Sequence, residues 1–125
     1  IMATCVDYAG ATYPKEHGGT AITPMQGVSL RPVLEGKTLE RAKPIFFAHE
    51  GNSAIRDGKW KLVAKKQGVK ADKWELYDMS VDRSETNNLA EKYPERLADM
   101  KKRWYAWAKS TQVFPSIHLG EKPLH

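Results

Sequence analysis

Cysteine is nearly absent from this sequence, because Cys5 is the single one among 125 residues. A lone cysteine excludes an internal disulfide and a zinc site built on a cysteine cluster. The sequence lacks an apolar run long enough to cross a bilayer, and its N-terminus lacks the basic, apolar and small-residue order of a signal peptide. Because the chain begins at Ile1, inside what reads as a helix, we expect a fragment of a longer protein. The missing signal therefore says nothing about the location of that parent.

Recognisable catalytic motifs are also missing. No Ser/His/Asp order, glycine-rich phosphate loop or pair of catalytic carboxylates stands out. Hydrophobic residues make up 41% of the chain and charged residues 28%, which predicts a soluble globular fold rather than disorder. The formal charge of +5 favours anionic partners, although many of the lysines fall on faces that water would cover in any case.

Hydrophobic alternation predicts several short strands. The apolar run 44–50 suits a strand covered on both faces, and 53–56 with 59–65 suits a hairpin. We expect Asp57-Gly58 to form its turn, of type I′, because both residues accept a positive φ. Trp60 and Leu62 should point inward, with Lys59 and Lys61 outward. In the next strand, 74–78, alternation places Trp74 and Leu76 on one face and Glu75 and Tyr77 on the other.

Helical spacing appears at both ends of the chain. Residues 1–10 read as the end of a helix, 11–27 as a loop, and 29–34 as a short helix that Ser29 caps and Gly36 ends. The final helix should span 94–109 with Leu97, Met100, Trp104 and Trp107 on one stripe. Together these elements predict an α+β fold, in which a small antiparallel sheet of three to four strands packs against a C-terminal amphipathic helix.

Three sequence blocks carry a family resemblance. They are Ala54-Ile55-Arg56-Asp57-Gly58-Lys59-Trp60-Lys61-Leu62, then Trp74-Glu75-Leu76-Tyr77-Asp78-Met79, then Asp82-Arg83-Ser84-Glu85-Thr86-Asn87-Asn88-Leu89. In this order they resemble the C-terminal subdomain of type I sulfatases, the arylsulfatase family of the alkaline-phosphatase-like superfamily. The resemblance implies three parts: 1–27 from the large α/β catalytic domain, 28–114 as the subdomain, and 115–125 as an irregular tail.

The resemblance also implies a function. The parent would hydrolyse aryl or carbohydrate sulfates with a formylglycine nucleophile, while calcium polarises the ester. This chain would form part of the substrate-cleft wall, pack on the large catalytic domain and be inactive alone. Separated from that domain it should expose an apolar surface through which it could dimerise. Sulfatases of this type are usually exported, so the parent would be periplasmic or secreted, and we expect no nucleic-acid or membrane partner.

The family's nucleophile and metal ligands are not expected in this chain. Cys5 has no small residue two places later and no arginine four places later, so it does not match the formylglycine motif and should be a buried small hydrophobe. The oxygen-bearing residues Asp82, Glu85, Asn87 and Asn88 lack the central glycine of an EF-hand loop. We interpret them as a turn whose side chains bond the local backbone.

Three residues are candidates for substrate binding: His49, Asn52 and Arg56. His49 sits at a predicted strand end and could donate a hydrogen bond to a sulfate ester or a sugar hydroxyl. A structural hydrogen bond across the domain interface is the alternative for His49, turn chemistry for Asn52, and a sheet-face ion pair for Arg56.

Two other functions are compatible with the sequence. A basic polyanion- or nucleic-acid-binding module would use the positive charge together with the aromatic residues. Such a module stacks bases on exposed aromatics, whereas all four tryptophans here fall on predicted inward faces. An interaction protein without an enzymatic parent is the second. Within the superfamily, a parent acting on phosphoesters is a further possibility.

Overall fold

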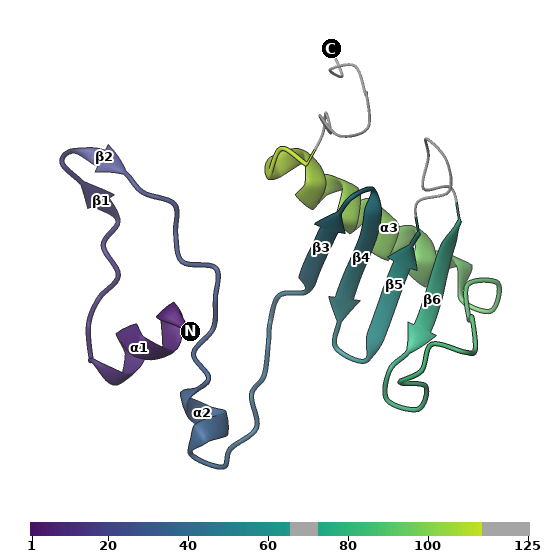
Figure 1. The fold of residues 1–125 in the computed structure, drawn as a ribbon, viewed down its shortest axis with the longest axis horizontal. Helices are drawn as coiled ribbons and strands as arrows, with labels where there is room; N and C mark the ends of the chain where they lie inside the picture. Colours follow the sequence, from purple (N-terminus) through teal and green to yellow (C-terminus); the bar gives the residue numbers. More distant parts are fainter. Residues whose placement is uncertain (66–72, 114–125) are drawn as a thin grey trace. The chain divides into compact units, whose positions relative to one another are not determined.

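The computed structural model describes residues 1–65 and 73–113. It divides into two compact units, Ile1–Ala42 and Lys43–His125, which are described separately. Figure 1 shows the order of the elements along the chain. The predicted tail, 115–125, lies outside the described residues.

The first unit contains two short helices and a minimal hairpin. Its elements are α1 (Met2–Tyr8), β1 (Glu16–His17), β2 (Thr20–Ala21) and α2 (Arg31–Leu34). The expectation that 11–27 is only a loop was therefore incomplete, because Gly18 and Gly19 adopt positive φ and let β1 and β2 pair. In the second helix, the predicted role of Ser29 is confirmed in part: its Oγ accepts a hydrogen bond from Arg31 N–H at 3.1 Å, although Leu30 is the N-cap residue.

Cys5 corrects a second expectation about this unit. It is exposed, not buried, because α1 has little to pack against and Ala3 is its one buried residue. Polar contacts join the two helices: Leu30 N–H donates to Thr4 Oγ1 at 3.0 Å, and the Arg31 guanidinium lies 3.4 Å from the Asp7 carboxylate.

The second unit is a four-stranded antiparallel sheet with a helix on one face (Figure 1). The strand order follows the sequence, and each strand pairs with the next. This confirms the predicted α+β fold and the expected backing helix. The elements are β3 (Ile45–His49), β4 (Asn52–Asp57), β5 (Trp60–Ala64), β6 (Trp74–Asp78) and α3 (Pro94–Ser110).

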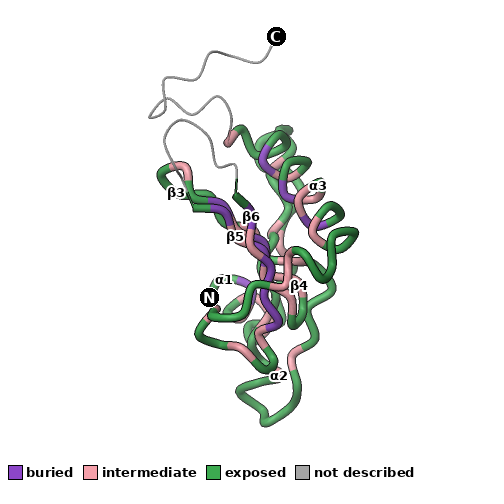
Figure 2. The backbone as a smooth tube through the Cα atoms, turned by 90° about the vertical axis from the view of Figure 1, so that its right-hand side faces the viewer, coloured by how far each residue is buried: buried purple, intermediate pink, exposed green. Residues whose placement is uncertain are grey.

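The hydrophobic core lies between the sheet and α3, where Figure 2 shows buried segments on both. Met100 and Trp104 of the predicted helix stripe are buried, and Leu97 and Trp107 pack against the same cluster. Complete burial of a large aliphatic side chain contributes roughly 1.5–3 kcal/mol, so this layer supplies much of the unit's stability. The fully buried residues, each with 0% exposure, are Ile55, Leu62, Leu76 and Ala108.

Tryptophans tie the sheet to the helix. Trp104 packs edge-on against Trp74 with ring centroids 5.5 Å apart, and its indole N–H donates to the Phe47 carbonyl at 3.0 Å. Phe46 stacks on Trp107 at 5.0 Å. The predicted inward orientation of the tryptophans is confirmed, which leaves the stacking platform of a nucleic-acid module without its main residues.

The β4–β5 turn differs from the prediction. Asp57 pairs with Trp60, so the two turn residues are Gly58 and Lys59 and not Asp57-Gly58. Gly58 has a φ of +54° and Lys59 does not share this positive value, which is the pattern of a type II′ turn with glycine first. The predicted type I′ turn was wrong because the register places Asp57 in the ladder, where its carboxylate meets Arg103 of α3 at 2.7 Å.

Strand β3 also differs from the prediction. It was expected to be covered on both faces, but it is an edge strand, and Phe47 is 51% exposed. Its apolar composition suggested a central strand, whereas among the described residues β3 pairs with β4 alone and lies at the sheet edge. Tyr77 shows the opposite deviation: it shares the outward face with Glu75, as predicted, yet it is only 6% exposed.

The segment between β6 and α3 is the predicted turn. The Asp82 carboxylate accepts hydrogen bonds from the Thr86 and Asn87 backbone N–H groups at 2.9–3.1 Å. These bonds lower the pKa of Asp82, because they stabilise its charged form. Asn88 Oδ1 accepts from Leu76 N–H at 3.1 Å, which fastens this segment to the free edge of β6. The structural interpretation of the acidic segment is confirmed.

Candidate functional site

His49 and Asn52 lie next to each other at the end of the β3–β4 hairpin. They are directly opposite in the strand register, and Asn52 Nδ2 donates to the His49 carbonyl at 3.1 Å. Glu50 and Gly51 connect them, with φ values of +49° and +85°, which is the conformation of a type I′ turn. The tight turn holds both side chains at the sheet rim. The His49 side chain is 84% exposed, so its imidazole is accessible to a ligand.

Arg56 lies on the same face of β4 but four positions farther along. At about 3.3 Å per residue, its Cα lies roughly 13 Å from that of Asn52. Its Nε donates to the Gly58 carbonyl at 2.8 Å, which braces the β4–β5 turn. His49 and Asn52 can therefore contact one small group together, whereas Arg56 is positioned for a different part of an elongated ligand.

The three candidates share the sheet face opposite α3, which we call the open face. Alternation places Ile55 under the helix, so its neighbours Ala54 and Arg56 point to the open face. Strand pairing then adds the outward residues of β3 and β5. We define the open face by Ile45, Phe47, His49, Asn52, Ala54, Arg56 and Val63.

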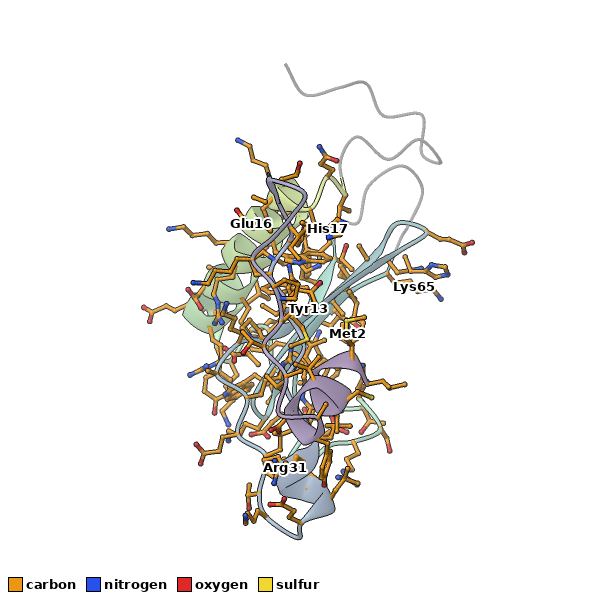
Figure 3. All side chains as sticks on the ribbon, turned by 90° about the vertical axis from the view of Figure 1, so that its left-hand side faces the viewer. Met2, Tyr13, Glu16, His17, Arg31 and Lys65 are labelled. Carbon is orange, nitrogen blue, oxygen red and sulfur yellow. The ribbon has the colours of Figure 1, made fainter. Side chains whose placement is uncertain are left out.

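A shallow hollow of about 340 Å³ lies on this face. Its floor is apolar, formed by Phe47, Ala54 and Val63. Polar and charged side chains surround the floor, and one of them, Lys65, lies just after β5 (Figure 3). The other polar lining residues are His49, Asn52, Ser53, Lys61 and Glu75. Sequence reasoning missed the hollow, although the spacing of Ile45, Phe47 and His49 along one strand already places these three on one face.

Ion pairs tie the β4–β5 hairpin to β6 and to the segment that follows it. Lys61 pairs with Glu85, and Lys59 Nζ lies 2.7 Å from the Asp78 carboxylate. The Lys59 ammonium, together with hydrogen bonds from Ser80, lowers the pKa of Asp78 to about 2. The two lysines were expected to point outward to solvent; the Lys59 side chain is 53% exposed and that of Lys61 27%, and each also has an acidic partner.

Tyr77 lies on the open face as well, on β6 opposite Lys61. Its hydroxyl donates to Glu75 at 2.8 Å. Burial raises its pKa to about 12, and the neighbouring carboxylates add to this effect. Tyr77 is therefore a neutral structural donor at ordinary pH, and it is not a catalytic base.

The donor set of the described residues does not fit a metal centre. Within 1–65 and 73–113, no group of three or more His, Cys, Asp or Glu side chains could hold a metal ion. In the same ranges, no helix combines the length and apolar character that crossing a membrane would require.

Comparison with known proteins identifies the family. No protein-family profile matches the chain. An uncharacterised sulfatase of Schizosaccharomyces pombe is 30% identical over 118 residues, covering 90% of this chain and 21% of the relative. The N-acetylglucosamine-6-O-sulfatase of Bacteroides thetaiotaomicron is 32% identical over 98 residues, covering 69% of this chain and 16% of the relative. The chain is a C-terminal sulfatase fragment. The predicted resemblance is confirmed.

The fold agrees with this assignment. A protein solved in complex with its substrate, D-glucosamine-2-N,6-O-disulfate, aligns with a TM-score of 0.59 and 22% identity, over 95% of this chain and 25% of that chain. This sulfatase fragment spans about a fifth of the length of the curated relatives it matches. The matched region is therefore a minor part of each of these relatives.

Proposed function

We propose that the parent protein hydrolyses sulfate esters and that this chain forms part of its substrate-cleft wall. The observation that carries the proposal is the 30–32% identity to curated sulfatases over most of the chain. In this assignment, residues 1–27 belong with the large catalytic domain, and 28–114 form the C-terminal subdomain. The chain alone is inactive, because catalysis needs the remainder of the polypeptide.

His49 and Asn52 contact the substrate in this proposal. Their place at a tight, exposed turn gives them access to a ligand, and both can donate hydrogen bonds to sulfate oxygens or sugar hydroxyls. Arg56, with its Cα roughly 13 Å from that of Asn52, would contact a more distant group of the same ligand. This spacing favours a sulfated carbohydrate over a small aryl sulfate, and the carbohydrate sulfatase among the relatives supports the same choice.

The relatives imply calcium and formylglycine in the parent. The described residues do not fit either group: they contain no metal-binding cluster, and Cys5 stands outside the nucleophile motif. We therefore assign calcium, which supplies Lewis-acid chemistry, and the nucleophile to the remainder of the polypeptide. This chain contributes binding and orientation of the substrate.

The test is sulfate release by the full-length protein, measured on an aryl sulfate and on glucosamine 6-sulfate. We expect His49→Ala to raise KM about tenfold with a smaller change in kcat, since about 1.4 kcal/mol is the order of one hydrogen bond to a charged group. His17→Ala, which alters an exposed hairpin residue of the first unit, is the matched control. The proposal would be contradicted if the full-length protein cleaved the corresponding phosphate esters and neither of the two sulfate esters. Unchanged KM in His49→Ala would remove His49 from the site.

A further inference from the structure

Cationic and aromatic side chains gather where β5 and α3 begin. The Arg96 guanidinium lies 4.7 Å from the centroid of the Trp60 ring, and the Lys92 ammonium lies 5.6 Å from that of Tyr93. The Trp60 and Tyr93 rings meet edge to face, with centroids 5.2 Å apart. Because cations are attracted to the faces of aromatic rings, these contacts hold the two positive charges in place. We call Trp60, Lys92, Tyr93 and Arg96 the aromatic–basic cluster.

The two cations of the cluster are free to contact a ligand. Lys59 is a third cation near Trp60, at 5.1 Å, but its ammonium already pairs with Asp78 at 2.7 Å. Within 1–65 and 73–113, by contrast, no carboxylate lies within ion-pairing distance of Lys92 or Arg96. Both residues are exposed. They can therefore donate to an anionic group without first breaking an ion pair.

A second hollow, of about 570 Å³, lies against this cluster. Two carboxylates line it beside the cations: Glu95 belongs to the first turn of α3, and Asp99 lies 3.5 Å from the Arg103 guanidinium. Carboxylates accept hydrogen bonds from hydroxyl groups, whereas the cations donate to anionic groups. The hollow is lined by Lys92, Tyr93, Pro94, Glu95, Arg96 and Asp99.

This mixed set of groups selects among anionic ligands. Two carboxylates beside the cations repel a nucleic-acid backbone, which carries a negative charge at every phosphate. A sulfated sugar has the complementary groups: sulfates for Lys92 and Arg96, and hydroxyls for the two carboxylates. Its apolar ring face can pack on Tyr93, which is 37% exposed. The hollow therefore fits a sulfated sugar better than a nucleic acid.

The cluster is separate from the candidate substrate residues. Trp60 pairs with Asp57 at one end of the β4–β5 ladder, whereas Asn52 lies beyond the other end, opposite His49. Figure 1 shows the β3–β4 and β4–β5 turns at opposite ends of the sheet. The five steps from Asn52 to Asp57 span roughly 17 Å of strand. Trp60 also packs toward the core beneath α3 and not on the open face. A single sugar unit does not reach from one place to the other.

We propose that the aromatic–basic cluster and its hollow form a second binding site, which holds a sulfated oligosaccharide away from His49 and Asn52. The choice of a sulfated sugar rests on the proposed function, whereas the position of the site does not. A long sulfated chain that contacts both places is held more tightly than a monosaccharide, because binding at one place raises the effective concentration at the other. The second site therefore favours long sulfated chains over short ones.

Calorimetric titration of the full-length protein with a heparin hexasaccharide, a sulfated sugar chain, tests this site. Lys92→Gln combined with Arg96→Gln removes both unpaired cations. Lys102→Gln combined with Lys109→Gln changes the net charge equally at two exposed lysines of α3 and is the matched control. We expect binding at least about tenfold weaker in the first double variant and less than about twofold weaker in the control. KM for glucosamine 6-sulfate should stay unchanged in both, because that ligand occupies only the His49 end.

Three results would overturn the second site. Equal weakening in the two double variants would assign the effect to net charge. Equal binding of the hexasaccharide and its chemically desulfated form would remove the role of the sulfates. Tighter binding of single-stranded DNA than of the hexasaccharide, lost with Lys92 and Arg96, would assign the cluster to nucleic acid.

Failure of the proposed function gives a different result. A full-length protein that releases no sulfate, yet loses hexasaccharide binding in the Lys92→Gln/Arg96→Gln variant, rejects the proposed function and retains the second site. Unchanged hexasaccharide binding in that variant, in an enzyme active on sulfates, rejects the second site alone.

Tyrosine variants test the stacking surface. Tyr93→Ala removes the exposed ring of the cluster, and Tyr105→Ala removes a tyrosine that is 44% exposed farther along α3. We expect Tyr93→Ala to weaken hexasaccharide binding at least about fivefold and Tyr105→Ala less than about twofold. Tyr93→Phe keeps the ring and should bind like the unchanged protein. Equal weakening by Tyr93→Ala and Tyr105→Ala would contradict a contact between the Tyr93 ring and the sugar.

Discussion

The two faces of the four-stranded sheet differ in how far their side chains are buried. The face toward α3 bears Ile55, Leu62 and Leu76, which are fully buried. The open face bears Phe47, which is half exposed, beside the hollow and the candidate substrate residues. The contrast shows that the helix-covered face determines the fold of this subdomain, while the open face is available for the proposed contacts with substrate and catalytic domain.

The largest expected effect comes from the covered face. Trp104→Ala removes an indole that packs on Trp74 and donates to the Phe47 carbonyl. We expect a loss of about 3–5 kcal/mol in the free energy of unfolding, as for other buried aromatic truncations. Urea unfolding of the 125-residue chain, followed by far-UV circular dichroism, measures the change. A loss below about 1 kcal/mol would mean that α3 does not close this face.

The covered edge should show an intermediate effect. Asn88→Ala removes the acceptor that holds Leu76 N–H and Ala90 N–H. Leaving a buried donor without a partner costs about 1–3 kcal/mol, and the same unfolding measurement applies. Asn87→Ala is the matched control, because Asn87 uses its backbone N–H to bond Asp82. Equal losses in the two variants would contradict the role of Asn88 at the β6 edge.

Acid sensitivity tests the ion pair at the end of β6. The pKa of Asp78 is lowered from 3.8 to about 2, chiefly by Lys59 and Ser80. A lowered folded-state pKa stabilises the fold above about pH 4, and this contribution is lost as the pH falls from about 4 through 2. Asp78→Asn should flatten the stability profile in that window, measured by urea unfolding at each pH. Ser80→Ala should move the acid-induced loss to higher pH, and no shift would contradict this assignment.

The smallest effect is expected on the open face of the chain alone. Phe47→Ala deletes a side chain that is half exposed, so the 125-residue chain should lose less than about 1.5 kcal/mol of unfolding free energy. The same substitution in the full-length protein should cost more, because packing on the catalytic domain buries the side chain. Equal losses in both proteins, measured by denaturant unfolding, would mean that Phe47 is no more buried in the full-length protein than in the chain alone.

The elements with strong periodicity were predictable from the sequence. The stripe containing Met100 and Trp104 and the alternation through Trp60 and Leu62 each have a single solution that buries the apolar side. The hairpin turn was misplaced by one residue, since Asp57-Gly58 and Gly58-Lys59 are both acceptable glycine-containing turns. The cross-strand register and the Arg103 contact favour the second, and no local pattern contains them.

The candidate site was only partly predictable. His49 and Asn52 could be placed together because the strand end and the turn are local features. The separation of Asn52 from Arg56 is also local, since four residues of one strand span roughly 13 Å, whereas the place of His49 opposite Asn52 depends on the strand register. The exposure of Phe47 was also unpredictable, because an apolar strand has the same sequence whether its own chain covers it or another part of the protein does.

Hydrogen exchange at β3 and β5 measures how each strand is protected with and without the rest of the protein. Mass spectrometry would compare backbone amides of 45–49 and 60–64 in the 125-residue chain and in the full-length protein. We expect slow exchange of β5 in both, and exchange of β3 at least tenfold slower in the full-length protein than in the chain alone. Equal exchange of β3 in the two proteins would contradict the claim that the remainder of the sulfatase covers the open face.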